Sequence, residues 1–258
     1  GRGEDGRPTA ERVVAEIEDS GGHAVASLES VTDFEAAGRI VATALECFGS
    51  ADILINNAGI AARGSILEVD AAEFARVASV HIEGSFICTR HVVEPMVDRR
   101  WGRIVTLVSR GGIPGMPGTI AYAVGKGAVL GLITGASREL GEHGITVNGV
   151  CPSSTRTEMV ESAIETLRQG DAAAQARADS LLSQMQTPDQ VARPIVALCT
   201  EAAGAVNGQV FLLEHGRVGL FQPLTVTQHV TSESDWSASA LGEAIASLEL
   251  HGLSDAYS

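Results

Sequence analysis

The chain has 258 residues, of which 45% are hydrophobic and only 4% aromatic, and it contains 29 glycines. This composition is typical of one large α/β domain with a core of Ala, Val, Ile and Leu. The net charge of −14 disfavours nucleic acid and anionic membranes as partners. We find no uninterrupted apolar stretch long enough to span a bilayer, so no membrane partner is expected.

The cysteines are few, widely separated and free of any CxxC motif. They are Cys47, Cys88, Cys151 and Cys199. Such cysteines are typical of reduced thiols in a cytoplasmic protein, and no signal peptide is visible.

Residues 1–8 spell a GxGxxG motif, but we reject a dinucleotide-binding interpretation. That motif works where a strand delivers the glycines to a helix N-terminus, whose amides bind the pyrophosphate. Here no strand precedes the glycines, and two acidic residues would repel phosphate. A surface loop is expected instead.

Hydrophobic periodicity predicts strands and helices that alternate along the rest of the chain. Strands are expected at residues 23–28, 52–55, 103–108, 145–150 and 209–213. Helices are expected at 9–19, 32–48, 70–96, 119–140, 187–198 and 241–248. This alternation with short connections predicts an α/β fold with a doubly wound parallel sheet.

Two segments depart from this regular pattern. Residues 158–186 are rich in Ala, Gln and Ser and are broken at Gly170, which suits a mobile substrate lid; the alternative is a loosely packed surface helix. We assign residues 1–216 to the main domain and residues 217–258 to a C-terminal extension packed on it.

The most informative pair of residues is Tyr122 and Lys126. Lys126 is the only lysine among 18 basic residues, and in a helix it lies one turn after the tyrosine on the same face. A neighbouring ammonium favours the phenolate, so the pair could act in proton transfer. The alternative is a chance pair on an amphipathic helix.

Polar groups follow the carboxyl ends of three predicted strands, where parallel sheets bind ligands. They are Asn56-Asn57-Ala58-Gly59, Ser109 and the run from Pro152 to Thr157. A plain turn is the alternative for the first of them, because Asn and Gly favour turns.

Together these residues resemble the short-chain dehydrogenase/reductase family. Asn56 to Gly59 looks like its NNAG motif, and Ser109 precedes Tyr122 by thirteen residues as the family's catalytic serine does. Tyr122 and Lys126 look like its YxxxK pair, and residues 152–157 resemble its PGxxxT loop. The flanking sequence is similar to the hydroxyacyl-CoA dehydrogenase part of peroxisomal multifunctional enzymes and to bacterial relatives.

The resemblance implies a Rossmann-like fold, an NAD or NADP cofactor and interconversion of a secondary alcohol and a ketone. Tyr122 would pass a proton to or from the substrate oxygen, and Ser109 would hydrogen-bond to it. Lys126 would hold the nicotinamide ribose and favour the phenolate of Tyr122. The remaining cofactor contacts would come from Asn56, Ala58, Gly59, Pro152 and Thr157.

The resemblance also implies a substrate class and partners. A 3-hydroxyacyl or 3-oxoacyl thioester such as an acyl-CoA, and a role in fatty-acid metabolism, are expected. Helices at 71–96 and 119–140 would pair in a homo-oligomer or with a related chain.

Three features depart from the family pattern. The opening strand, the TGxxxGxG loop and its helix are absent from the sequence, which predicts either a fragment, since Gly1 is not Met, or a non-catalytic subunit that pairs with a complete relative. His81 stands where the family often has an asparagine, and either replaces it as a hydrogen-bond donor or packs in the core. Ser153 and Ser30 replace a glycine and an aspartate, and their hydroxyls can still form hydrogen bonds.

Overall fold

The computed structural model describes residues 9–183, 185–231, 235 and 237–249, so the predicted loop at residues 1–8 lies outside them. The chain forms two compact units, Gly1–Leu220 and Phe221–Ser258. The predicted domain end at residue 216 falls inside a hairpin that belongs to the first unit. That residues 221–258 pack on this domain remains a prediction.

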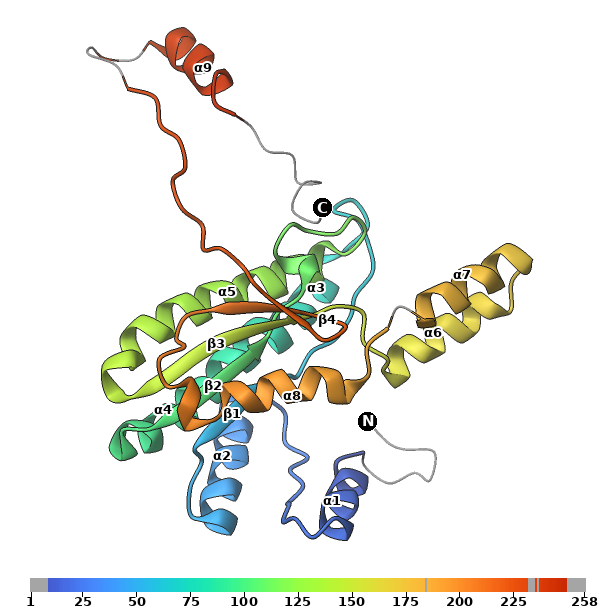
Figure 1. Ribbon diagram of the computed structural model, residues 1–258, viewed down its shortest axis with the longest axis vertical. Helices are drawn as coiled ribbons and strands as arrows, with labels where there is room; N and C mark the ends of the chain where they lie inside the picture. The colour runs from blue at the N-terminus through green and yellow to red at the C-terminus, as the bar shows by residue number, and fades with distance from the viewer. Residues whose placement is uncertain (1–8, 184, 232–234, 236, 250–258) are drawn as a thin grey trace. The chain divides into compact units, whose positions relative to one another are not determined.

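The first unit contains one sheet, in which four parallel strands follow their order in the sequence (Figure 1). They are β1 (Ile53–Asn56), β2 (Gly102–Leu107), β3 (Ile145–Pro152) and β4 (Val210–Glu214). A fifth strand, β5 (Arg217–Leu220), pairs antiparallel with β4 and was not predicted. Their turn is made by His215 and Gly216, both with positive φ, as a tight hairpin requires.

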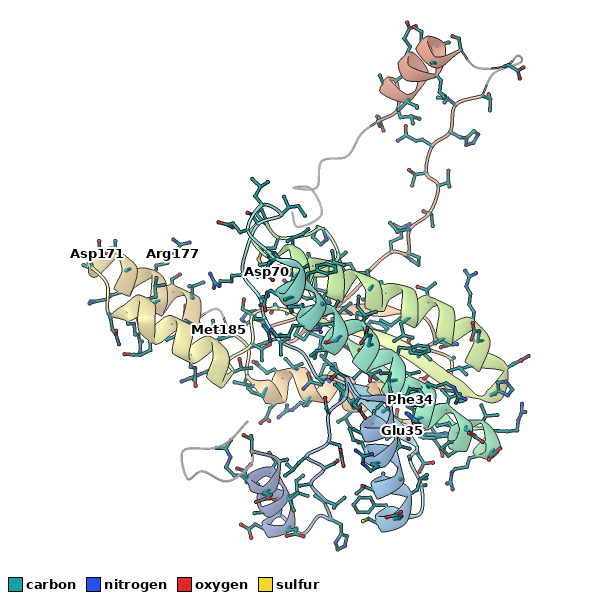
Figure 2. The ribbon with its side chains drawn as sticks, turned by 180° about the vertical axis from the view of Figure 1, so that it is seen from behind. Phe34, Glu35, Asp70, Asp171, Arg177 and Met185 are labelled. Atoms are coloured by element: carbon teal, nitrogen blue, oxygen red, sulfur yellow. The ribbon has the colours of Figure 1, made fainter. Side chains whose placement is uncertain are left out.

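The helices lie mostly at the predicted positions, and the last of them belongs to the second unit. They are α1 (Thr9–Asp19), α2 (Phe34–Phe48), α3 (Ala71–Ala78), α4 (Gly84–Arg99), α5 (Ile120–Leu140), α6 (Glu158–Arg168), α7 (Ala172–Ser183), α8 (Pro188–Leu198) and α9 (Ala238–Ala246). Side chains begin several of them: the Asp33 carboxylate accepts a hydrogen bond from Ala36 N at 2.7 Å, and Asp70, labelled in Figure 2, caps α3 similarly.

Helices cover both faces of the sheet, which confirms the predicted Rossmann-like α/β fold. Alternate residues of β2 point to opposite faces. Ile104 packs with α2, α4 and α5, the side that Figure 2 brings to the front. Val105 and Leu107 pack with Val191 of α8 on the other face. The central strands β2 and β3 are buried on both faces, and polar residues follow their carboxyl ends.

Two predicted elements are wrong. Residues 23–28 are extended but form no strand, because the described residues provide no neighbouring strand; Val25 and Leu28 are 43% and 66% exposed. The helix predicted at 70–96 is interrupted by a π turn at Ser79–Glu83, where Gly84 N donates to Ser79 O. This turn separates α3 from α4 and holds His81.

One helical stretch, Ile120–His143, is long and apolar enough to cross a membrane when judged by length and composition alone. Its buried face includes Val129 and Ile133, and α5 packs against β3. Other apolar residues of the helix, such as Val124, remain exposed.

Candidate active site

Ser109 follows the carboxyl end of β2 and is held by the backbone around it. It caps a short 3-10 turn, Arg110–Gly112, and its Oγ accepts a hydrogen bond from Gly111 N at 3.2 Å. Val108 N donates to Val150 O of β3, so the pairing of the two strands continues up to the serine. The hydroxyl is therefore positioned by the central strands of the sheet.

Gly111 and Gly112 bring this turn against α5. A Cβ on Gly111 would lie 3.3 Å from the Tyr122 ring and 3.6 Å from Ser109 Oγ, so both side chains border the same point. A Cβ on Gly112 would lie 2.4 Å from the backbone carbon of Lys126. Only glycine fits there. The sequence signal for this close approach is the pair of glycines two residues after Ser109.

Lys126 is 7% exposed, and its Nζ donates a 2.6 Å hydrogen bond to Leu107 O at the end of β2. Burial lowers the pKa of Lys126 to about 8, with the Cys151 thiol opposing the shift. Because an ammonium has three N–H groups, two remain beyond the bond to Leu107. Lys126 is thus fixed one helical turn below Tyr122, which is itself only half-buried.

His81 lies on the other side of Tyr122. The two rings meet edge to face, with centroids 5.3 Å apart and an interplanar angle of 87°. His81 is 1% exposed, and its Nε2 lies 2.8 Å from Ile60 O. Burial lowers the pKa of His81 and the Lys126 charge lowers it further, while the hydrogen bond to Ile60 opposes this. The four predicted catalytic residues are therefore gathered around the first turns of α5.

The residues predicted to line the cofactor cleft after β1 differ in accessibility. Asn56 is buried, and its Nδ2 donates to the hydroxyls of Thr89 and Thr106 at 3.1 and 3.3 Å. It therefore joins β1 to α4 and β2 inside the protein. Ala58 and Gly59 are exposed in the loop that follows.

The loop after β3 contains the other predicted cofactor contacts. Pro152 ends the strand, and Thr157 caps α6 without using its side chain. The Ser153 hydroxyl is buried with no hydrogen-bond partner in the part of the chain that the structure describes. A buried hydroxyl without a partner costs free energy, so a ligand group that bonds to it would be stabilised.

Gln186 holds this loop in place and was missed by the sequence analysis. It is 1% exposed, its Nε2 donates to Leu213 O at 3.1 Å, and its backbone pairs with Ser154 and Arg156. It therefore joins the loop after β3, the end of the predicted lid and β4. A single polar residue after a helix gives no sequence signal for such a long-range role.

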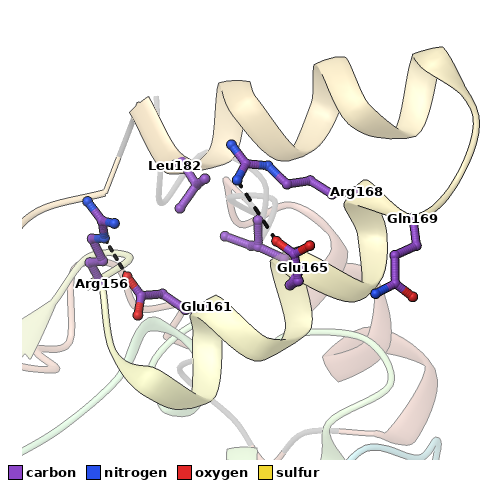
Figure 3. Close-up of a pocket in the computed structure, with 7 residues that line it drawn as sticks. Arg156, Glu161, Glu165, Arg168, Gln169 and Leu182 are labelled. Atoms are coloured by element: carbon purple, nitrogen blue, oxygen red, sulfur yellow. Dashed lines mark hydrogen bonds and ion pairs between the residues drawn. The ribbon is translucent and has the colours of Figure 1, made fainter.

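The predicted lid at 158–186 forms two helices, α6 and α7, that meet at the turn marked by Asp171 in Figure 2. A cavity of about 570 Å³ lies between them (Figure 3). Its arginines are paired with acids: Arg156 with Glu161 at 2.5 Å, and Arg168 with Glu165 at 3.9 Å. None of the four catalytic candidates lines it, so we place the chemistry at the strand ends and not here.

The residues at the strand ends fit the nicotinamide-ribose half of a dinucleotide. Lys126 has N–H donors beyond the one used by Leu107, the Ser153 hydroxyl is unpartnered, and Ala58 and Gly59 are accessible. A hydroxyl-rich ribose and a carboxamide need donors and acceptors of this kind.

Known proteins match this chain over most of its length. The family model described as Enoyl-(Acyl carrier protein) reductase matches residues 4–217. A 3-oxoacyl-[acyl-carrier-protein] reductase from Synechocystis is 32% identical over 81% of this chain and 82% of its own. A 2-(S)-hydroxypropyl-CoM dehydrogenase from Xanthobacter autotrophicus is 29% identical over 82% and 83%.

A solved structure has the same fold. It is a short chain dehydrogenase from Mycobacterium avium, 30% identical, with a TM-score of 0.80 over 95% of this chain and 82% of that one. The mostly parallel sheet with helices on both faces agrees with this match. The chain therefore belongs to the short-chain dehydrogenase/reductase family of oxidoreductases.

Proposed function

We propose that this protein interconverts a secondary alcohol and a ketone with NAD or NADP, through Ser109, Tyr122 and Lys126. The observation that carries the proposal is the common border of Ser109 Oγ and the Tyr122 ring at Gly111, with Lys126 buried one turn away. A substrate oxygen at that border would meet one hydroxyl donor and one phenol.

The protein's part in the reaction is to handle the proton and the developing charge. When bound, the nicotinamide cofactor supplies or accepts the hydride. In ketone reduction, the Tyr122 hydroxyl gives its proton to the substrate oxygen while Ser109 donates a hydrogen bond to the same oxygen. Lys126, largely protonated at neutral pH, favours the phenolate left on Tyr122. Alcohol oxidation reverses these transfers.

A 3-hydroxyacyl or 3-oxoacyl thioester is the substrate class we favour. The name of one relative places an oxo group on an acyl chain carried by a protein, and that of a relative from Thauera aromatica places a hydroxy group on an acyl-CoA. These names support the class, and a cytoplasmic role in fatty-acid metabolism is proposed with it.

We also propose that the protein works as an oligomer built on α4 and α5. Phe86 of α4 and Val124 of α5 are 54% and 40% exposed. Exposed apolar helix faces are typical of subunit interfaces.

The test is the Tyr122→Phe variant, assayed with acetoacetyl-CoA and either NADH or NADPH. Losing the proton donor should lower kcat by at least about 100-fold, with cofactor affinity unchanged in a fluorescence titration. Tyr257→Phe, at the only other tyrosine and outside the matched region, is the control. A Tyr122→Phe variant that keeps kcat within tenfold of the unmodified protein contradicts the proposal.

A further inference from the structure

We propose that the ion pair between Arg110 and Glu214 positions the Ser109 hydroxyl in the active site. Arg110 Nη2 and Glu214 Oε1 form this pair, although the two residues lie far apart in the sequence. The proposal rests on the proposed function, because Ser109 is the residue that the pair holds. Arg110 and Glu214 are therefore positioning residues, which act on the reaction through the serine.

Arg110 attaches the turn after Ser109 to two successive strands of the sheet. It directly follows the serine and begins the 3-10 turn Arg110–Gly112. Burial raises the pKa of the Cys151 thiol of β3 to about 11, while the Arg110 charge and a hydrogen bond from the Arg110 backbone oppose the rise. The main chain of Arg110 thus meets β3 and its side chain reaches β4. Because Ser109 Oγ accepts from Gly111 N inside this turn, a shift of the turn also moves the hydroxyl.

Glu214 is held firmly by its neighbours in the sheet. It is the last residue of β4 and pairs with Arg217 across the hairpin to β5. The carbonyl of the preceding residue, Leu213, accepts hydrogen bonds from Ser153 N at 2.9 Å and from Gln186 Nε2 at 3.1 Å. The carboxylate therefore projects from a backbone that is bonded on both sides, which gives Arg110 a fixed partner.

The exposure of the pair indicates where its effect will be seen. The side chains of Arg110 and Glu214 are 37% and 31% exposed, and ion pairs this accessible to water contribute little to the free energy of unfolding. A catalytic group displaced by about 1 Å, in contrast, can lower turnover by about 100-fold. Loss of the pair should therefore lower kcat much more than it lowers stability.

The test is a double-variant cycle with Arg110→Gln and Glu214→Gln, assayed with acetoacetyl-CoA and whichever of NADH and NADPH gives turnover. Each single variant should lower kcat per folded molecule between about 5-fold and 20-fold, with the KM for the cofactor changed by less than about twofold. Because both variants break the same pair, the double variant should be no more than about twofold slower than the slower single variant.

A second cycle tests whether the pair acts through the serine. In a Ser109→Ala background, Glu214→Gln should change the residual kcat by less than about twofold, because the hydroxyl that the pair positions is gone. The matched control is the double variant Arg39→Gln/Glu29→Gln, which removes a loop-to-helix ion pair with side chains 57% and 36% exposed. It should keep kcat within about twofold of the unmodified protein.

The possible outcomes separate the two claims. If the losses of the two single variants multiply, if they leave kcat within about twofold, or if Glu214→Gln lowers kcat equally with and without the Ser109 hydroxyl, the pair does not position Ser109 and the inference is wrong. If the unmodified protein folds but has no turnover with either cofactor, the proposed function fails and this inference fails with it.

Discussion

Two buried basic residues, Arg103 and Lys126, lie at opposite ends of the same strand. Arg103 is the second residue of β2 and is 3% exposed; Lys126 is 7% exposed and donates to Leu107 O, the last carbonyl of that strand. Both charges are stabilised by backbone carbonyls. They differ in how many of their N–H donors the fold itself uses.

Arg103 donates three hydrogen bonds to the protein, through Nε and Nη1. Its guanidinium donates to the carbonyls of Gly102, Gly144 and Thr200 at 2.8, 3.4 and 3.2 Å, and it stacks 4.4 Å from the Trp101 ring. A planar guanidinium with five donors can bind several backbone carbonyls at once. Arg103 therefore holds together the segments at the amino end of the sheet.

Among the described residues, Lys126 has one hydrogen-bond partner, Leu107 O, and its two other donors lie at the carboxyl end of β2, where Ser109 and Tyr122 lie. A compact ammonium can serve a phenol and a ribose hydroxyl together, which a planar fork does less well. This explains why the only lysine in a chain of 17 arginines stands at this position. Burial alone therefore does not mark a functional charge; Lys126 differs from Arg103 in its position at the carboxyl end of β2, close to Ser109 and Tyr122.

The comparison predicts its largest effect on stability at Arg103. Arg103→Met removes donors from three backbone carbonyls, and leaving buried carbonyls unpaired should cost about 3–5 kcal/mol in the free energy of unfolding. Urea denaturation measures it. The exposed Arg138→Met is the control and should stay within about 0.5 kcal/mol. If Arg103→Met lowers the free energy of unfolding by less than about 1 kcal/mol, Arg103 does not have this structural role.

A smaller effect is predicted in the pH dependence of stability. The pKa of Lys126 is lowered from 10.5 to about 8 in the folded protein, so between these values the unfolded chain binds more protons. Stability should therefore rise with pH across this window, by up to about 3 kcal/mol in total. The Lys126→Met variant should lack this pH dependence. Urea denaturation of both proteins at about pH 7 and pH 10 gives the difference in their free energies of unfolding at each pH. If the difference in free energy of unfolding between the two proteins is the same at both pH values, Lys126 is not a buried cation.

Local patterns predicted most of the fold. The strands β1 to β4 are short apolar runs, and helix α8 begins with Thr187 and Gln190, whose reciprocal hydrogen bonds form the expected capping box. The grouping of Ser109 with Tyr122 and Lys126 came from the resemblance to the family. In the structure Ser109 Oγ and the Tyr122 ring both border Gly111, and Lys126 is buried one helical turn after Tyr122.

What could not be predicted depends on contacts between distant segments. Residues 23–28 have the composition of a strand, but a strand forms only beside another one. His81, in the π turn, contacts Ile60 and Tyr122, which no local window around residue 81 contains. Gln186 and Arg103 were missed for the same reason, since their partners are backbone carbonyls far away in the sequence.

The most direct test of the account is the turnover of two variants that carry the same substitution, Lys126→Met and Arg103→Met. With acetoacetyl-CoA and the preferred cofactor, kcat per folded molecule should fall by at least about 100-fold in Lys126→Met and stay within about twofold in Arg103→Met. If Lys126→Met retains its turnover, or both variants lose it equally, the carboxyl end of β2 is not the active site.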